Sequence, residues 1–498
     1  MLEGSKSHRV AVAAGILAVA ALSLLLPFAP VYDAWGWLVW GREVGSLDLD
    51  TGGGPSWKPL PVIFTTAFGF AGDAAPSLWL VVARAGWIAA ALLAAKVAMR
   101  LAPTRDGRIR LAAGVVAGAG VLLFDDPFTS WLRQFAGGLS EPLLVAVILG
   151  AVDRELDGHR GQAFGLGVAA ALLRPEVWPF LALYGAWLWR ERALERRALV
   201  AGAAAIPILW LVPDLIGSGD ALTGAGRARS GTGSPPGEAL EAVGRCLELA
   251  PWAMWPAAAY AAARTWIRGE HTVPVLAAFA VGWIGVVAVL AALGYAGLPR
   301  FGAPAAALGC VLGAVGLVVL YEEFRSAQRL AERLRSVRLG VLITRDRYRR
   351  AVLGLGVLVS LCAALVLQGA LRAGEVPGQF DAAREFGERI DDLDALVSEV
   401  GADRLVRCDE VATSDLLVQT AIAWNLEVPM GDVGVRVKSL PRRGTMIVRA
   451  DMPRALRSLV EVRGERLGGN RSWDAYAVSC GADSARPALI AGVTGARR

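Results

Sequence analysis

Charged residues are scarce in this sequence. Asp, Glu, Lys and Arg make up 19% of its 498 residues, and hydrophobic residues make up 55%. A typical soluble domain has about 25% charged and about 45–50% apolar residues. The apolar surplus lies in long runs of Ala, Leu, Val and Gly, many of them close to the roughly 20 residues that cross a bilayer. The composition therefore excludes an ordinary soluble protein and predicts a polytopic membrane protein.

Cysteines are also few, with five in the chain. None has the CxxC or His/Cys spacing of a zinc site. Cys310 and Cys362 lie inside apolar runs and are interpreted as small core residues, whereas Cys246 has no assigned role. Cys408 and Cys480 lie in the polar C-terminal region, where we expect a disulfide if that region is outside the cytosol.

The sequence has no basic stripe with interleaved aromatic residues, so its net charge of +6 does not indicate a nucleic-acid partner. Arginines gather instead in short segments between apolar runs, including nine within residues 321–350. About eleven spans are predicted, at residues 10–30, 78–99, 111–124, 141–152, 163–173, 177–189, 198–213, 251–267, 272–293, 301–320 and 351–370. The first span lacks a small-x-small cleavage site and is interpreted as a retained helix. The positive-inside rule then places the N-terminus in the cytoplasm and the C-terminus outside.

Three segments on the outer side are long. The loop at residues 31–77 contains four tryptophans, at positions 35, 37, 40 and 57, and we expect it to lie on the bilayer surface. The loop at 214–250 has a Gly/Ser/Pro stretch at 224–237 and is predicted to be mobile, as a lid is. The tail after residue 371 is predicted to fold as a small α/β domain. It combines a helix at 380–400, a strand at 404–408, a helix at 413–424 and β-prone runs at 433–437, 445–449 and 473–479.

Asp33 and Lys58 are the first candidates for chemistry. Asp33 directly follows the first span, and a carboxylate near a tryptophan-rich membrane surface has the weakened solvation that suits proton abstraction. It is equally interpretable as a helix N-cap. Lys58 precedes Pro59 and can neutralise a lipid phosphate, although a lysine that only reaches toward lipid headgroups gives the same pattern.

The next outer loop holds three carboxylates, those of Asp125, Asp126 and Glu141. Such groups can coordinate a divalent cation or orient a sugar through its hydroxyls. Asp-Pro and Ser-Glu-Pro sequences are also ordinary turn and helix-start signals.

Further candidates are charges set among apolar residues. Arg174-Pro175-Glu176 interrupts the apolar stretch at 164–189, which has to turn back near the proline if both flanks are cytoplasmic. A charge pair at such an apex is costly unless it is paired or lines a polar cavity, so it is either a functional group or an internal ion pair that closes the hairpin. Arg84 and Arg300, near the outer ends of their spans, could face the same cavity.

In their order and shared sidedness, these motifs resemble the GT-C superfamily of glycosyltransferases over about residues 10–370. Asp33 matches the acidic residue early in the first outer loop, which is the catalytic carboxylate of that family. Lys58-Pro59 is similar to the Lys-Pro-Pro element of aminoarabinose- and mannosyl-type members, whose lysine contacts the carrier phosphate. Asp33 is not followed by a second acidic residue, unlike the family's paired acids, so metal dependence stays open.

Other motifs match more loosely. Asp125, Asp126 and Glu141 fit the acidic residue and Gly/Ser-Glu-Pro helix start of the family's second outer loop. Arg174-Pro175-Glu176 resembles the Arg-Pro-Glu of the middle spans, and Pro299-Arg300-Phe301 with Pro304 resembles the Pro-Arg-Tyr-x-x-Pro segment.

The resemblance implies a fold, a reaction and a site. The fold expected is an all-α transmembrane domain over residues 1–370 with an extracytoplasmic α/β domain over 371–498. The reaction expected is an inverting transfer, at the outer face of the plasma membrane, from a polyprenyl-phosphate sugar to a cell-envelope glycan, lipid or protein. The site expected has Asp33 as base, Lys58, Arg84, Arg174 and Arg300 at the donor phosphate, and Trp35, Trp57, Asp125, Asp126, Glu141 and Glu176 at the substrate. A lipid or glycan transporter and a non-catalytic scaffold are the alternatives, since charges inside a membrane also line transport pathways.

Overall fold

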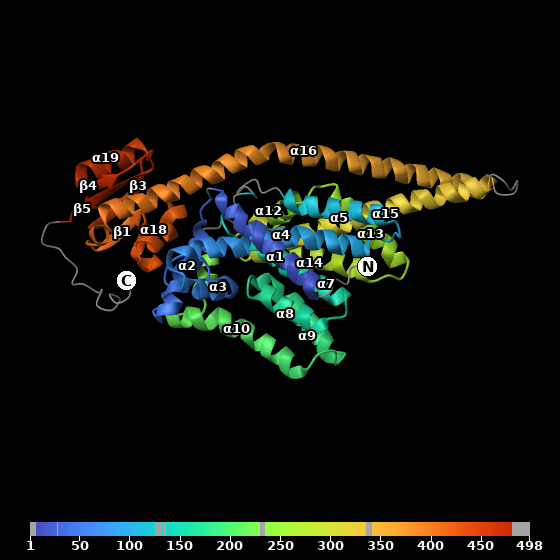
Figure 1. The fold of residues 1–498 in the computed structure, drawn as a ribbon, viewed down its shortest axis with the longest axis horizontal. Helices are drawn as coiled ribbons and strands as arrows, with labels where there is room; N and C mark the ends of the chain where they lie inside the picture. The colour runs from blue at the N-terminus through green and yellow to red at the C-terminus, as the bar shows by residue number, and fades with distance from the viewer. Residues whose placement is uncertain are drawn as a thin grey trace.

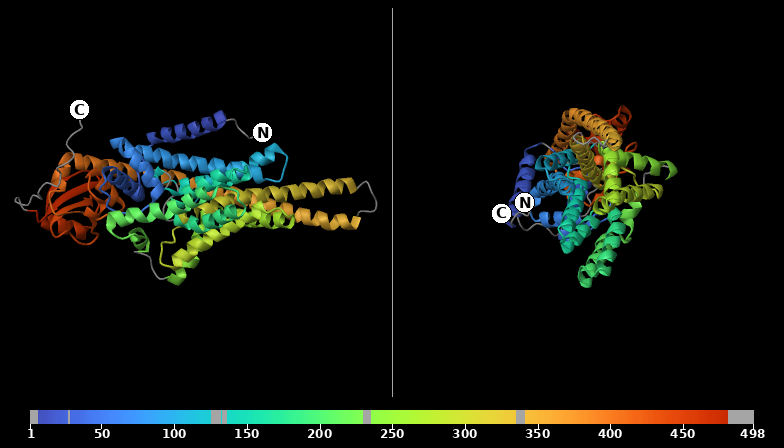
Figure 2. Two further views of the ribbon diagram at one scale, coloured as in Figure 1. Left: turned by 90° about the horizontal axis from the view of Figure 1, so that it is seen from below. Right: turned by 90° about the vertical axis from the view of Figure 1, so that its right-hand side faces the viewer.

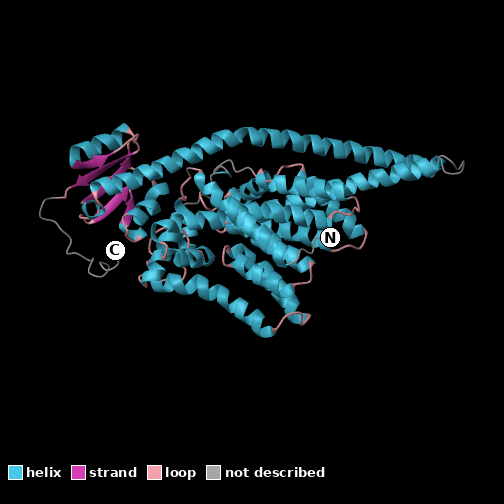
Figure 3. Ribbon diagram, in the orientation of Figure 1, coloured by secondary structure: helices cyan, strands magenta, loops and turns pink. Residues whose placement is uncertain are grey.

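The protein is an elongated helical bundle with a small α/β domain at one end (Figure 1). The fold is taken from a computed structural model that describes residues 6–26, 28–124, 132, 136–229, 235–334 and 341–480. Strands occur only in the C-terminal domain of this described part (Figure 3).

The helices of the bundle follow the predicted spans. They are α1 (Lys6–Leu22), α4 (Ala75–Leu101), α5 (Gly107–Leu122), α7 (Glu141–Leu156), α8 (Arg160–Ala171), α9 (Trp178–Arg190), α10 (Arg196–Ser218), α13 (Met254–Ile267), α14 (Thr272–Ala292), α15 (Ala303–Leu334) and α16 (Val341–Val400). Six stretches of the described chain, which include α1, α4, α10, α14, α15 and the apolar part of α16, are long and apolar enough to cross a membrane alone. The chain is therefore a multi-pass membrane protein.

Helix α15 forms the centre of the bundle. The apolar window of its span is entirely buried, whereas the windows of α1 and α16 are 6% buried. Small residues let its neighbour α13 approach closely, because a Cβ on Gly316 would lie 1.9 Å from the carbonyl oxygen of Ala257. Peripheral spans keep their apolar faces outward, as expected of helices that contact lipid.

The connections on the side of the C-terminal domain contain shorter helices. The first predicted outer loop folds into α2 (Tyr32–Ser46) and α3 (Pro59–Gly69), and the loop predicted at 214–250 folds into α11 (Thr223–Arg229) and α12 (Pro235–Leu249). Residues 230–234 of the stretch expected to be mobile lie outside the described residues. Helix α11 is attached to the first loop, because Arg227 donates to the carbonyl of Gly53 at 2.8 Å and Ser56 donates to that of Gly224 at 3.0 Å.

The C-terminal domain is a five-stranded mixed sheet of order β2-β1-β3-β5-β4. Strands β1 (Glu410–Thr413), β2 (Val433–Val435) and β3 (Gly444–Arg449) are parallel, and β5 (Trp473–Val478) is antiparallel to both β3 and β4 (Gly464–Gly469). Alternate residues face opposite layers, as the period of two in a strand requires. In β3, Met446 packs with α19 (Arg454–Arg463), whereas Ile447 packs with α16 and α18 (Gln419–Asn425).

Helix α16 joins the two parts of the molecule. It runs without interruption through residues 370 and 371 and along the length of the bundle to the sheet (Figure 1 and Figure 2). Its buried residues Leu393 and Leu396 pack in one cluster with Trp473 of β5 and with Trp37 and Trp40 of α2. The loop after α1 and the C-terminal domain therefore share one hydrophobic core.

Several sequence-based boundaries in this domain are wrong. Residues 402–405 form the short helix α17 (Ala402–Leu405), because the chain turns at Gly401, whose φ is 88°, and buries Leu405 completely. The strand expected at 404–408 begins instead at Glu410. The helix expected at 413–424 begins only at Gln419, and α19 and β4 were not predicted.

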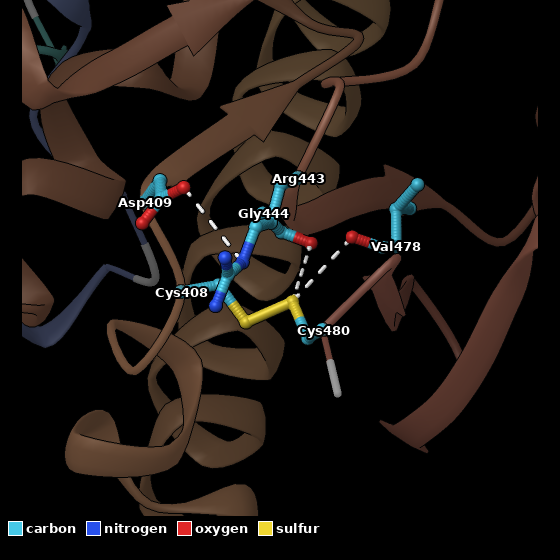
Figure 4. Close-up of a disulfide and its surroundings, with 6 residues drawn as sticks. All are labelled: Cys408, Asp409, Arg443, Gly444, Val478 and Cys480. Atoms are coloured by element: carbon cyan, nitrogen blue, oxygen red, sulfur yellow. Dashed lines mark hydrogen bonds and ion pairs between the residues drawn. A yellow bond between two sulfur atoms is a disulfide. The ribbon is translucent and has the colours of Figure 1, made fainter. Parts of the chain in front are cut away.

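The structure joins Cys408, just before β1, to Cys480, just after β5, in a disulfide whose Cα atoms are 6.1 Å apart (Figure 4). This is the pair expected from the sequence. The bond connects segments 72 residues apart and links the two ends of the folded C-terminal domain.

Candidate functional site

Charged side chains from four distant segments meet at the end of the bundle that adjoins the C-terminal domain. Each stands at a proline that begins a helical turn: Lys58 before Pro59, Glu141 before Pro142, Arg174 before Pro175 and Arg300 after Pro299. Proline is favoured in the first turn because no helical partner is needed for its missing N–H group. Helix N-termini thus converge here, and their dipoles favour a negatively charged ligand.

Glu141 lies at the centre of this charge cluster and has no exposed surface. Its Oε1 atom is 3.1 Å from Arg174 Nη1, 3.6 Å from Lys58 Nζ and 3.8 Å from Arg300 Nε. Its Oε2 atom has no hydrogen-bond partner among the residues that the structure describes. One buried carboxylate therefore holds three cations together.

Arg174 is fully engaged by carboxylates. Its Nε and Nη2 donate to Glu176 at 3.1 and 2.5 Å, and its Nη1 donates to Glu141 at 3.1 Å. Its guanidinium also lies 3.6 Å from the ring centroid of Phe301. Such a bidentate, stacked arrangement fixes the arginine in place. The pair Arg174–Glu176 closes the turn between α8 and α9, as one of the two sequence interpretations expected.

Lys58 forms fewer hydrogen bonds than Arg174. It donates one hydrogen bond of 3.0 Å to Ser140 Oγ, and its ammonium lies 5.0 Å from the ring centroid of Trp37. Burial lowers the pKa of this lysine, while Glu141 acts in the opposite direction. No further hydrogen bond of Lys58 is present within the described part of the chain.

Asp33 and Arg300 form the open side of the cluster. Their side chains are 18% and 17% exposed, and Asp33 Oδ2 lies 3.6 Å from Arg300 Nη2. The interpretation of Asp33 as an N-cap is wrong, because Val31 is the N-cap of α2 and no side-chain capping bond is present. Asp33 instead occupies the first turn of α2 and points its carboxylate at the cations.

The C-terminal domain forms hydrogen bonds with α2 at Tyr32, the residue next to Asp33. Thr420 Oγ1 donates to the carbonyl of Tyr32 at 2.8 Å, and the Tyr32 hydroxyl donates to Gln419 Oε1 at 3.1 Å. Burial raises the pKa of Tyr32 to about 12, so this hydroxyl stays protonated near neutral pH. Farther along α2, Arg42 donates to the carbonyls of Trp424 and Val428 at 3.1 and 3.2 Å.

Some predicted site residues lie elsewhere. Arg84 is 1% exposed and donates to the carbonyls of Ser23 and Ala136 at 2.8 and 2.9 Å, so it braces α4 against its neighbours and does not face the cluster. Asp125 and Asp126 lie outside the described residues.

The tryptophans of the first loop, which were the reason for expecting this loop to lie on the bilayer, do not face outward. Trp35, Trp37, Trp40 and Trp57 are at most 5% exposed. The ring centroids of Trp57 and Trp40 are 5.3 Å apart, and those of Trp35 and Trp424 of α18 are 5.9 Å apart. Trp57 Nε1 donates to the carbonyl of Leu209. The four tryptophans fill the core between the bundle and the C-terminal domain, which offers more apolar contact than the bilayer surface does.

Sequence reasoning missed Ser140, Trp37 and Phe301 as members of the cluster, and Gln419 and Thr420 as its support. Ser140 stands beside Glu141 in the Ser-Glu-Pro motif, so its position was available from the sequence. The contacts of the other four residues depend on how distant segments pack.

The cluster is poorly suited to a divalent cation. Both Asp33 and Glu141 already face cationic side chains within 4 Å. Among the described residues there is also no group of three His, Cys, Asp or Glu side chains with the spacing of a metal site.

The fold has counterparts among solved structures. It matches ArnT from Cupriavidus metallidurans in the apo state with a TM-score of 0.53 and 13% identity, over 95% of this chain and 98% of that one. It matches the same protein bound to undecaprenyl phosphate with a TM-score of 0.54 and 12% identity, over 97% and 100% of the two chains. No family model and no curated protein matches the sequence. The expected fold, an all-α membrane bundle with a small C-terminal α/β domain, is confirmed, and it is shared with ArnT.

Proposed function

We propose that this protein is a membrane glycosyltransferase that transfers a sugar from a polyprenyl-phosphate carrier to a cell-envelope acceptor. One observation carries the proposal: a partly exposed carboxylate, Asp33, stands beside a cluster of cations whose central counter-charge is buried. Transfer from a lipid phosphate needs both parts, a base for the acceptor hydroxyl and positive charge for the departing phosphate. The structural neighbour that binds undecaprenyl phosphate supports a carrier of this class.

In the proposed reaction, Asp33 takes the proton of the acceptor hydroxyl while the hydroxyl oxygen attacks the anomeric carbon of the sugar. The bond from that carbon to the carrier phosphate oxygen breaks in the same step, and the carrier leaves as a phosphate. A direct displacement of this kind inverts the anomeric centre. General-base assistance contributes about 10²–10⁴-fold to such reactions.

The cations have different parts in this proposal. Lys58 and Arg300 lie 3.6 and 3.8 Å from Glu141, and both distances are longer than a hydrogen bond. These two side chains can therefore turn toward a phosphate while Glu141 keeps its bond to Arg174. Arg174 keeps Glu141 and Glu176 neutralised and acts as a positioning residue. We therefore assign the carrier phosphate to Lys58 and Arg300, supported by the converging helix N-termini.

The C-terminal domain is proposed to hold the acceptor, because α18 lies against α2 on the side of Asp33. The arginine-rich segments are predicted to lie on the cytoplasmic side, so we propose that this domain and the cluster lie outside the cytoplasm. Helix α11, anchored to the first loop through Arg227, is proposed to border the donor entrance.

The test is an assay of purified protein against a panel of polyprenyl-phosphate sugars, with the wild type compared with Asp33→Asn. We expect turnover of one donor by the wild type and a 10²–10⁴-fold loss in the variant. Asp48→Asn is the matched control, because Asp48 is an exposed carboxylate of the same loop. Thermal melting establishes that all three proteins are equally folded.

Two outcomes would contradict the proposal. An Asp33→Asn variant as active as the wild type would exclude Asp33 as the base. Donor binding without turnover by the wild type would favour a transporter or a scaffold, since both retain the charges and lack the chemistry.

A further inference from the structure

A groove between α5, α15 and α16 lies at the end of the bundle opposite the charge cluster. It has a volume of about 350 Å³, within the range of about 300–1,000 Å³ typical of small-molecule sites. The surface of its lining is almost wholly apolar, so Arg108 and Tyr321 line it mainly with the apolar parts of their side chains, beside Val116, Ala314 and Cys362.

The three helices show the direction in which the groove runs. Arg108 is near the start of α5, Tyr321 is in the second half of α15, and Leu358 precedes Cys362 on α16. On α5 the lining extends from Arg108 to Val116, eight residues or about 12 Å of helix. The groove is therefore an apolar slot with an arginine and a tyrosine at one end.

The arginine end carries positive charge that forms no ion pair among the described residues. Arg105 and Arg108 are both exposed, and the guanidinium of Arg108 has no ion pair among the described residues. The nearby acids are already engaged, because Asp106 lies 3.8 Å from Arg325 and Glu322 accepts a hydrogen bond from Thr104 at 2.7 Å. An anionic group would be attracted by Arg105 and Arg108, and the two nearby carboxylates are occupied by other partners.

The groove is separate from the proposed glycosyl-transfer site. Arg300 stands before α15 and Tyr321 lies 21 residues later, which corresponds to about 30 Å of helix, the thickness of a bilayer core. A lipid with its head group at Arg108 would belong to the leaflet opposite the charge cluster. Basic pockets between membrane helices on the cytoplasmic side bind anionic lipid head groups in general.

We propose that this groove is a binding site for an anionic phospholipid of the membrane. One acyl chain lies along Ala112, Val116 and Leu358, and the phosphate contacts Arg108, with the hydroxyl of Tyr321 nearby. The bound lipid would fill the space between α5 and α16 and stabilise the packing of α16 on the bundle. This inference does not depend on the transferase activity.

Cys362 provides the test because it is the free cysteine with exposed surface. Cys246 and Cys310 are buried, and the other two cysteines form the disulfide. Full-length protein, delipidated in detergent, would be titrated with dioleoyl-phosphatidylglycerol or dioleoyl-phosphatidylcholine in mixed micelles. The rate of maleimide modification measures the access to Cys362, and Cys362→Ser gives the background. Native mass spectrometry counts the lipids retained.

We expect phosphatidylglycerol to slow the modification of Cys362 and to remain bound with a stoichiometry of one. Arg108→Ala should raise the half-protecting concentration about fivefold, the effect of one basic residue near a lipid phosphate. Arg105→Ala is the matched control, because Arg105 is exposed at the same end and does not line the groove. It should leave the protection unchanged.

The proposal would be overturned if phosphatidylcholine protected Cys362 equally well, or if Arg108→Ala and Arg105→Ala behaved alike. Protection by undecaprenyl phosphate at a lower concentration than by phosphatidylglycerol would identify the groove as a carrier site instead. A Cys362 that does not react in the delipidated protein would show that the groove is closed to ligands.

Discussion

Replacing Lys58 and Arg174 separately by methionine tests whether two buried cations of one cluster have different roles. Both residues contact Glu141, and both are less than 10% exposed. Methionine retains most of the side-chain volume and removes the charge. The structure predicts a loss of donor binding for the first variant and a loss of stability for the second.

The expected magnitudes follow from the bonds that each residue makes. Lys58 makes one hydrogen bond to the described residues, and Glu141 keeps Arg174 and Arg300 as partners when Lys58 is removed. A charged hydrogen bond to the carrier phosphate contributes about 1.5–3 kcal/mol, so kcat/KM for the donor should fall about 10–100-fold in Lys58→Met. The free energy of unfolding should change by at most about 1 kcal/mol, because the desolvation cost of the lysine is removed as well.

Arg174→Met leaves two buried carboxylates without the three hydrogen bonds that neutralise them. Breaking a buried ion pair by removing one partner costs about 3–5 kcal/mol. The variant should therefore melt at a clearly lower temperature, and any activity that remains should have a nearly unchanged KM for the donor.

The assay is steady-state kinetics over a range of donor concentrations, combined with thermal melting in the same detergent. A Lys58→Met protein that is folded and has the KM and kcat of the wild type would refute the assignment of Lys58 to the phosphate. A stable Arg174→Met protein with a greatly raised KM would reverse the two roles.

Three other predictions concern the C-terminal domain and the first outer loop. Thr420→Val removes the hydrogen bond to Tyr32 and should lower kcat roughly fivefold with an unchanged donor KM, whereas Thr420→Ser should restore kcat. The control is Thr445→Val, at a buried hydroxyl without a partner among the described residues, which should have no effect in the same kinetic assay. Cys408→Ser should lower the unfolding free energy of the domain by about 4 kcal/mol, because the disulfide closes a loop of 72 residues and so constrains the unfolded chain. A wild type that melts identically with and without reductant would contradict this. Burial raises the pKa of the Glu43 carboxyl from 4.5 to about 7. Its contribution to the free energy of unfolding, about 3 kcal/mol, is therefore present below pH 4.5 and is lost as the pH rises through about 7. Denaturation measured between pH 5 and 8 should show this fall in the wild type and not in Glu43→Gln.

Much of the site could be recognised from local sequence. Lys58-Pro59, Glu141-Pro142, Arg174-Pro175 and Pro299-Arg300 each place a charge at the start of a helical turn, and the structure brings all four together. Their local signal is sufficient because a proline next to a charge is a common helix-start signal. The same reasoning could not separate Arg84 from Arg300, since both stand near the outer end of a span.

The folded chain distinguishes the two arginines by the direction of the helix faces that carry them. Arg300 precedes the central helix α15 and reaches Asp33, whereas Arg84 turns toward the carbonyls of Ser23 and Ala136. The strand β4, with glycines at 464, 468 and 469, has little local β-propensity and is held by its pairing with β5. Its existence could not be read from composition.

By itself, the sequence determined the membrane class, the positions of the apolar helices and the residues that begin them, because these depend on composition and on neighbours along the chain. Tertiary structure alone decided that the tryptophans at 35, 37, 40 and 57 are core residues, that α16 extends from the bundle into the C-terminal domain, and that Glu141 holds three cations. Burial and ion pairing are properties of contacts between segments far apart in sequence, so they are fixed only when the whole chain has packed.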